Sequence, residues 1–364
     1  MNKEVLIVSQ EFPPGPGGIG SHAYSMAKSF HEKGIDVTVV ASMDYVTPQQ
    51  VEVFDNKQPF KVVRFDRNTI FHFIKRFATV WKNMKQNVIY SGRFPLWVGL
   101  FFSIFKPRVN SIAVLHGSEV RPSSKMYILL THLSIWAIKN IVAVSAFTKD
   151  LIPRWTIRNK KVEVIPNGIN PQMFKIPEAK QHLKGYPAIL TVGNVTPRKG
   201  QHRIIKVLPA VLKKYPDAHY HIVGLPTYKD EFLKLAEEKG VAQAVTFHGK
   251  AEKFEDLFDF YYSADVFAIL SENQPDGDCE GFGIVVLEAG IFGLPTIGAT
   301  GNGIADAVKP GHNGMLVDGD NPQEFCEALT TILENKEEFS QNANTWALNH
   351  DWNNIINDFI QILK

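Results

Sequence analysis

Short apolar runs rich in valine and isoleucine alternate with stretches of helical periodicity along the first half of the chain. The runs at 5–9, 37–41, 87–90, 112–116, 141–145 and 162–165 are continuous rather than alternating, which is typical of strands buried on both faces. A helical pattern follows the first run, over 20–33. Alternation of strand and helix predicts a parallel, doubly wound sheet.

The pattern restarts in the second half, after the turn-forming sequence Pro166–Asn167–Gly168. Strands are expected at 189–193, 220–223, 245–248, 266–270 and 295–298, with helices at 201–214, 229–239, 254–263 and 322–334. The predicted fold class is therefore α/β, with two facing doubly wound, Rossmann-like domains over 1–168 and 169–344. Ligands bind at the carboxyl ends of the strands in such sheets, so we expect a deep interdomain cleft. A final helix over 345–364 is expected to return to the first domain.

Length and composition agree with two globular domains. The 364 residues are too many for one compact core, and 45% hydrophobic with 21% charged residues excludes a disordered or fibrous chain. The two cysteines, Cys279 and Cys326, provide neither a disulfide framework nor a cysteine zinc cluster, so we expect a reducing, cytoplasmic setting. The longest apolar run, 96–105, is too short to cross a bilayer as a helix, so any membrane contact is expected to be peripheral.

The charges are divided unequally between the two halves. Residues 1–167 carry a net charge of +11 and residues 168–364 a net charge of −9, which together give +2. Such a division predicts that the first domain faces something anionic: nucleic acid, a membrane surface or an acidic substrate.

A glycine-rich segment at 13–20 lies between the first strand and the first helix, and it includes Gly17, Gly18 and Gly20. Glycines let the backbone approach a ligand closely, and the helix N-terminus behind them offers free amides to a phosphate. The segment lacks the GxGxxG spacing with a later acidic residue that is typical of dinucleotide sites. A flexible turn without a ligand is the alternative.

Two further segments of the second domain contain charged residues that could bind a ligand. Arg198 and Lys199 lie in a strand-to-helix loop, where adjacent cations can bind a diphosphate and stabilise a phosphate leaving group. Glu280 and Glu288 flank Gly281–Phe282–Gly283–Ile284, a glycine-rich turn leading into an apolar helix. A carboxylate among apolar neighbours needs donors, and sugar hydroxyls can supply them. The alternatives are a solvated Arg–Lys pair and a helix with one solvent-facing Glu.

His116 follows a strand of the first domain, in Leu115–His116–Gly117. This position predicts a side chain at the carboxyl edge of the sheet, where ligands bind. A core or surface histidine without a ligand is the alternative.

Together these motifs resemble the family-4 retaining glycosyltransferases of the two-domain GT-B fold. The similarity extends over nearly the whole chain, through 14–20, 116–117, 142–145, 164–168, 193–200, 280–288, 293–295 and 313–317. It implies that a hexose-type sugar is transferred from a UDP- or GDP-sugar to an acceptor hydroxyl, with retention at the anomeric carbon. A role in glycan, polysaccharide or glycolipid biosynthesis follows from the same resemblance.

The resemblance also implies roles for individual residues. Gly17, Gly18 and Gly20 would lie under the donor diphosphate, which Arg198 and Lys199 would bind. Glu280 would hydrogen-bond the transferred sugar near the amides of 281–284, Glu288 would bind the ribose, and His116 would contact the donor sugar near the reacting centre. Lys250 would lie near the nucleotide base. Family members commonly have Arg where this chain has Asn194, so Arg198, Lys199 and backbone amides would carry the phosphate charge.

No cofactor or metal is expected beside the nucleotide sugar. Asp276–Gly277–Asp278 and Asp318–Gly319–Asp320 mimic a metal-binding Asp-x-Asp, but turn chemistry explains both. Two alternatives to a catalyst remain: a non-catalytic nucleotide-sugar-binding protein and, on fold alone, a dinucleotide-dependent oxidoreductase.

The acceptor side is predicted from the basic first domain. Residues 67–86 place apolar side chains at helical spacing, with Lys75, Arg76, Lys82 and Lys85 elsewhere around the helix. A basic amphipathic helix can lie on an anionic membrane, whereas a sheet-packing helix with solvated lysines is the alternative. We expect a glycan, lipid-linked or other anionic acceptor, with peripheral attachment at the inner face of the membrane. No nucleic acid is expected, because no recognised nucleic-acid motif accompanies the basic residues. The apolar positions of this helix are Ile70, Phe73, Ile74, Phe77, Val80, Trp81 and Met84.

Overall fold

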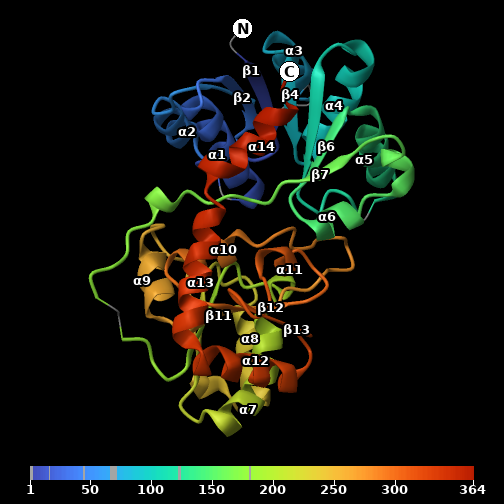
Figure 1. Ribbon diagram of the computed structural model, residues 1–364. Helices are drawn as coiled ribbons and strands as arrows, with labels where there is room; N and C mark the ends of the chain where they lie inside the picture. The colour runs from blue at the N-terminus through green and yellow to red at the C-terminus, as the bar shows by residue number, and fades with distance from the viewer. Residues whose placement is uncertain (1–2, 16, 44–45, 66–71, 122–123, 180–181) are drawn as a thin grey trace. The chain divides into compact units, whose positions relative to one another are not determined.

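The computed structural model describes residues 3–15, 17–43, 46–65, 72–121, 124–179 and 182–364 (Figure 1). The chain divides into two compact units, which are described separately. Unit 1 comprises Met1–Gly168 and Trp352–Lys364, and unit 2 comprises Ile169–Asp351. Each unit is built around its own parallel sheet, so the predicted fold class of two doubly wound α/β domains is confirmed.

Unit 1 holds a seven-stranded sheet in the order β3-β2-β1-β4-β5-β6-β7. All its strand pairs are parallel. The central strands are buried along their length, as continuous apolar runs require. Strand β3 was not predicted, because Lys61 and Arg64 interrupt its short apolar sequence. The strands are β1 (Glu4–Ser9), β2 (Asp36–Ser42), β3 (Lys61–Phe65), β4 (Asn87–Ser91), β5 (Asn110–Leu115), β6 (Asn140–Ala143) and β7 (Val162–Val164).

Helices cover both faces of this sheet. The core on one face joins Leu6 and Val88 of the strands to Leu96 and Phe102 of α4 and Ile135 of α5. Helix α1 packs against β1 and β2, and α14 packs against α1. The helices of unit 1 are α1 (Gly18–Glu32), α2 (Pro48–Asp55), α3 (His72–Lys82), α4 (Arg93–Phe105), α5 (Lys125–Ala137), α6 (Ala146–Asp150) and α14 (Trp352–Ile362), with the 3₁₀ helix η1 (Arg154–Ile157).

The end of the chain forms two helices rather than the single predicted helix over 345–364. Helix α13 (Lys336–Asn349) belongs to unit 2, the chain turns at His350 and Asp351, and α14 belongs to unit 1. The prediction was wrong at this break, because both helices continue the same apolar periodicity. A ladder of asparagines anchors the returning segment: Asn110 Nδ2 donates to Asn87 Oδ1 at 2.8 Å and to the Ile362 carbonyl at 2.9 Å.

Unit 2 holds a six-stranded parallel sheet in the order β10-β9-β8-β11-β12-β13. The strands are β8 (Ala188–Val192), β9 (His219–Val223), β10 (Val245–Gly249), β11 (Val266–Ile269), β12 (Thr296–Ala299) and β13 (Gly314–Val317). The helices are α7 (Gln201–Lys214), α8 (Lys229–Glu238), α9 (Asp256–Ser263), α10 (Ile284–Ile291), α11 (Ile304–Ala307), α12 (Pro322–Glu334) and α13, with η2 (Pro171–Met173), η3 (Pro197–Lys199) and η4 (Ala242–Ala244).

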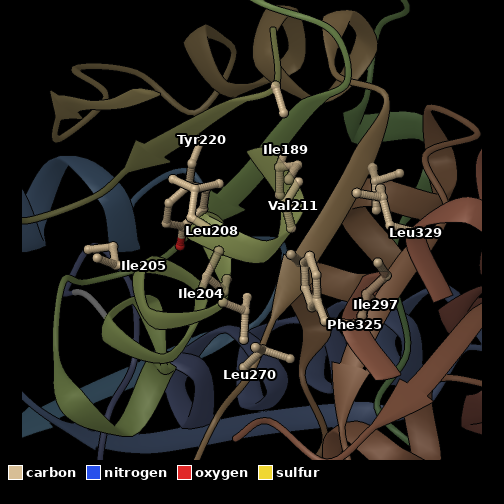
Figure 2. Packing of buried hydrophobic residues seen from close by; sticks show 14 of the residues in the cluster. Ile189, Ile204, Ile205, Leu208, Val211, Tyr220, Leu270, Ile297, Phe325 and Leu329 are labelled. Carbon is tan, nitrogen blue, oxygen red and sulfur yellow. The ribbon is translucent and has the colours of Figure 1, made fainter. Parts of the chain in front are cut away.

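The core of unit 2 lies between this sheet and the helices α7 and α12. Ile204, Leu208 and Val211 of α7 pack beside Phe325 and Leu329 of α12, against strand side chains (Figure 2). These positions repeat every three or four residues, which is the spacing of a helix face turned to a sheet. The strand ends that follow this core carry the candidate site.

None of the helices that the structure describes is both long enough and apolar enough to span a membrane.

Candidate functional site

The loop after β8 brings Arg198 and Lys199 to the carboxyl edge of the unit 2 sheet. Both residues lie in η3, which is followed by Gly200. Gly200 has φ +75°, and a Cβ there would lie 1.9 Å from the carbonyl oxygen of Leu270. The loop can therefore fold back against β11 only with glycine at this position. The backbone of Glu272 also donates to the Arg198 carbonyl at 3.0 Å, which fixes the loop to the next strand end.

The three residues predicted to meet the donor's phosphates and sugar lie together. Glu280 Oε2 accepts hydrogen bonds of 2.6 Å from both Arg198 Nη1 and Lys199 Nζ. Asp278 adds a second carboxylate, 3.0 Å from Arg198 Nε. The alternative of a merely solvated Arg–Lys pair is therefore wrong.

The two cations keep Glu280 ionised. Burial by itself would raise the pKa of this carboxyl, but the charges of Lys199 and Arg198, and their hydrogen bonds, hold its pKa below the usual value. The cluster thus contains an ionised carboxylate bonded to a guanidinium and an ammonium group.

The glycine-rich turn positions Glu280 at the start of α10. Gly283 is the residue before the helix and has φ +93°. The amide of Gly303 donates to the Glu280 carbonyl at 2.8 Å. Phe282 is buried, whereas Ile284, the first helical residue, is partly buried. Gly281 lies so close to Gly303 that a Cβ on the latter would be 2.2 Å from the Gly281 carbonyl.

Glu288 lies on α10 just over one turn from its start, and it points to the interior of unit 2. Its Oε2 accepts a hydrogen bond of 2.7 Å from the phenol of Tyr261 on α9. Burial raises the pKa of Glu288, while the bond from Tyr261 and the charge of Lys199 lower it. A helix with one solvent-facing Glu is therefore the wrong description. Tyr261 was missed, because nothing in the sequence connects position 261 with position 288.

The remaining predicted residues of unit 2 are exposed or have other partners. Lys250 is exposed on the loop after the edge strand β10. Asp276 accepts from the Asp278 amide at 3.0 Å in a turn. Asp320 pairs with the buried Arg203 at 2.9 Å. Among the residues that the structure describes, no three His, Cys, Asp or Glu side chains are grouped to hold a metal ion.

The glycine-rich segment of unit 1 forms the start of α1. Gly17 precedes the helix with φ +138°, and a Cβ on it would lie 2.0 Å from the carboxylate of Glu11. A Cβ on Gly20 would lie 3.1 Å from the Phe12 amide nitrogen, while Gly18 has open space around it. The positive φ explains why the segment favours glycine at 17; its contact with a diphosphate stays a prediction.

His116 lies at the end of β5 and is joined to α1 through a second histidine. Its Nε2 lies 2.9 Å from Ser91 Oγ, its amide donates to Glu119 Oε1 at 2.6 Å, and its ring meets His22 edge-to-face at 4.9 Å between centroids. Burial lowers the pKa of His116 to about 4, so the ring is neutral. Ser91 and His22 were missed, because neither belongs to a recognised motif.

The predicted basic helix over 67–86 is observed as α3 over His72–Lys82. Arg67 and Ile70 lie outside the described residues. Arg76 does not lie on a solvated face: it is buried, with its guanidinium 4.5 Å and 4.3 Å from the ring centroids of Phe65 and Phe94.

Apolar side chains of α3 and α4 are left exposed on the outer surface of unit 1. Trp81, Ile104 and Phe105 are 49%, 64% and 59% exposed. An apolar groove lies beside them, and the ammonium of Lys106 sits 4.3 Å from the Trp81 ring centroid. Helices α3, α4 and α5 contain no Asp or Glu. We call this surface the α3–α4 face. The groove is lined by Ile74, Phe77, Ala78, Trp81, Phe101 and Phe102.

Comparison with known proteins matches both units to family models. Residues 16–173 match the model described as Glycosyltransferase Family 4, and residues 172–346 match the model described as Glycosyl transferases group 1. The chain is 27% identical over 359 residues to a GDP-mannose-dependent monoacylated alpha-(1-6)-phosphatidylinositol monomannoside mannosyltransferase of Corynebacterium glutamicum, covering 92% of this chain and 89% of the relative. A GDP-mannose-dependent alpha-(1-6)-phosphatidylinositol monomannoside mannosyltransferase of Mycobacterium tuberculosis is 26% identical over 350 residues, covering 92% and 90%.

Solved structures show the same fold. Anabaena Alr3699/HepE, crystallised with UDP and glucose, superposes with a TM-score of 0.77 at 20% identity, covering 99% of both chains. Sucrose-phosphate synthase of Thermosynechococcus elongatus superposes with a TM-score of 0.76 at 18% identity, covering 99% of this chain and 98% of the other. The GT-B fold predicted from the motifs is thus confirmed.

Proposed function

The chain belongs to glycosyltransferase family 4 and is a glycosyltransferase, and from this premise we propose that it transfers a hexose from a UDP- or GDP-sugar with retention at the anomeric carbon. The observation that carries this proposal is the cluster of Arg198 and Lys199 on Glu280. It places phosphate-binding cations directly beside a carboxylate that can accept bonds from sugar hydroxyls. Family membership removes the dinucleotide-oxidoreductase alternative.

The proposed chemistry relies on charge and position. Arg198 and Lys199 stabilise the negative charge of the leaving diphosphate, and the sugar is held for attack from the face that the phosphate leaves. Glu280 is bonded to two cations and Glu288 to Tyr261. In this proposal both carboxylates serve as binding groups that accept hydrogen bonds from hydroxyls, and neither attacks the anomeric carbon. Glu288 binds the ribose hydroxyls in this proposal, and His116 contacts the sugar.

We propose that no divalent metal is required. The guanidinium and ammonium supply positive charge at the place where an ion would act. Activity that persists in EDTA would agree with this, and activity restored only by Mg²⁺ or Mn²⁺ would contradict it.

The relatives' names make GDP-mannose the first donor to test and a lipid-linked glycan the first class of acceptor. The α3–α4 face supports a lipid-linked acceptor, because exposed aromatic side chains beside lysines and without acidic residues suit an anionic membrane surface. We propose that unit 2 binds the donor, that unit 1 binds the acceptor, and that the protein works peripherally at the inner face of the membrane.

The test is a product assay with UDP- and GDP-sugars and membrane lipid extracts, supported by thermal melting with each nucleotide. One donor should give a labelled lipid product, with the anomeric configuration retained by NMR. Stabilisation by a nucleotide without any transfer, across the donor panel, would instead favour the non-catalytic binding protein.

A further inference from the structure

The carboxylate of Glu280 occupies the position in which an anionic ligand would meet the cations of unit 2. Its Oε2 atom lies 2.6 Å from both Arg198 Nη1 and Lys199 Nζ. Phosphate oxygens seek the same guanidinium and ammonium donors as a carboxylate does. The protein's own carboxylate and the donor's diphosphate therefore compete for one pair of cations.

The charges of the cluster already balance before a ligand binds. Arg198 and Lys199 are matched by Glu280 and Asp278. The Arg198, Lys199 and Glu280 side chains are only 25%, 12% and 14% exposed, so water screens them weakly. A diphosphate added beside an unmoved Glu280 would place like charges around the same donors, and such an arrangement is costly where screening is weak.

We propose that Glu280 is a displaceable internal anion: the diphosphate of the donor releases it from Arg198 and Lys199, and the released carboxylate accepts hydrogen bonds from hydroxyls of the donor sugar. This inference rests on the proposed function of the same site. In this proposal, a single movement of Glu280 couples recognition of the phosphates to recognition of the sugar.

The displacement lets the site distinguish the nucleotide-sugar donor from the nucleoside diphosphate product. When a sugar is present, the released carboxylate has hydroxyl donors. With a nucleoside diphosphate alone it has none, and an unpaired, weakly hydrated carboxylate returns to its cations. Glu280 thus favours the nucleotide sugar over the free nucleoside diphosphate and helps to expel that product after transfer.

A different role for Glu280 predicts the opposite result. If its carboxylate stayed in place and only oriented Arg198 and Lys199, its removal would disorder both cations. Binding of a nucleoside diphosphate would then weaken. The sign of the change in affinity therefore distinguishes displacement from fixed support.

The experiment is titration calorimetry of UDP and GDP, and of UDP-glucose and GDP-mannose, with wild type, Glu280→Gln and Asp278→Asn. We expect Glu280→Gln to bind the preferred nucleoside diphosphate about tenfold more tightly at low salt, because a competing charge-assisted contact is gone. The gain should shrink as salt rises. The same variant should lose most of the preference for the nucleotide sugar over the nucleoside diphosphate. Asp278→Asn removes one charge from a side chain that is 50% exposed and contacts Arg198, so its gain should be smaller.

Unchanged or weaker binding of the nucleoside diphosphate by Glu280→Gln would overturn the displacement. An equal gain in Asp278→Asn would overturn it too, because the effect would be one of net charge. Melting without nucleotide checks folding, and Glu280→Ala, with the same expected gain, serves as a second variant. If neither nucleotide binds to wild type or to Glu280→Gln, the proposed function itself falls, and this inference falls with it.

Discussion

The phenol of Tyr261 donates a hydrogen bond of 2.7 Å to Oε2 of Glu288. It comes from α9 and reaches α10, and the Tyr261 ring is also stacked on Phe292. Burial raises the pKa of Glu288, and this bond opposes the rise. The pair therefore keeps a carboxylate available inside unit 2, where the ribose of the donor is proposed to bind.

We expect Tyr261→Phe to lower the free energy of unfolding by about 1–2 kcal/mol at neutral pH, because Glu288 loses a buried donor. A carboxyl with a raised pKa is easiest to bury when protonated, so it destabilises the fold as the pH rises through that pKa. Loss of the Tyr261 bond raises the pKa further. The variant should therefore lose less stability at mildly acidic pH than at neutral pH, as measured by urea unfolding at both.

Tyr220→Phe is the matched control. Tyr220 is equally buried, and its hydroxyl lies 2.8 Å from Thr191 Oγ1 rather than from a carboxylate. Its loss should cost the same at both pH values. Parallel behaviour of the two variants would show that the carboxylate does not determine the effect.

Gly303→Ala should impair the site through the backbone. A Cβ at Gly303 would lie 2.2 Å from the Gly281 carbonyl and 2.6 Å from that of Glu280, so the turn that holds Glu280 must move. Because displacements of about 1 Å can cost a hundredfold in rate, we expect kcat/KM to fall at least tenfold. Gly301→Asn is the control: its φ of +79° suits asparagine, and no heavy atom lies within 4 Å of the added Cβ. Full activity of Gly303→Ala would contradict the role of this turn.

His22 should make unit 1 sensitive to acid. Burial, followed by the nearby His116, lowers its pKa well below the usual value. Among the described residues neither of its ring nitrogens has a hydrogen-bond partner. A histidine whose pKa is lowered by folding stabilises the fold above its unfolded value of about 6.5, and this contribution is lost as the pH falls below it.

Replacement His22→Phe should therefore reduce the loss of stability between neutral pH and about pH 5 by roughly 1–2 kcal/mol. Phenylalanine keeps edge contacts with Trp352 and Phe359 like those of the native ring. Chemical unfolding across the pH range measures the effect, and His31→Phe, at an exposed position, is the control. An unchanged acid response of His22→Phe would rule out this source of the sensitivity.

The α3–α4 face should bind anionic vesicles. We expect the double variant Ile104→Ser/Phe105→Ser to weaken co-sedimentation at least tenfold. Burying each native side chain in the membrane would contribute about 1.5–3 kcal/mol to the free energy of binding. Binding should require anionic lipid and weaken with salt, since Lys106 and its basic neighbours contribute charge.

Leu348→Ser, at a 45% exposed position of α13 in unit 2, is the control for a general loss of surface apolarity. Equal sedimentation of the double variant and wild type would argue against membrane binding by the α3–α4 face. Binding of wild type to zwitterionic vesicles as strongly as to anionic vesicles would argue against it too.

Most of the fold followed from the apolar runs, because buried parallel strands have no polar face to interrupt them. The strands that escaped prediction, β3 and β13, are short and lie at the sheet edges, where partial exposure weakens the pattern. In the site, Arg198, Lys199 and Glu280 were predicted because motif chemistry and spacing identify them. Their bonds to one another were not, because ion pairing over 80 residues of sequence depends on how two loops meet.

For the same reason, the sequence did not predict the contacts of Tyr261, Ser91 and His22. Each acts by contact with a motif residue that is remote in sequence. Arg76 shows the converse case: its sequence neighbours indicate a solvated cation, while the structure places it between the rings of Phe65 and Phe94. Tertiary partners determine such positions, and a single sequence does not list them.

The chain leaves unit 1 after Gly168 and returns to it at Trp352, so unit 2 is inserted into unit 1. During synthesis, every residue of unit 2 is made before α14 can cover α1 and before the segment that follows Asn349 can reach the asparagine ladder. Until then Phe30 and His22 lack the aromatic partners that α14 provides. Unit 2 can therefore complete its fold while unit 1 still lacks α14. An isolated unit 1 would need α14 joined to it by a short linker, because cutting the chain at Gly168 removes part of its core.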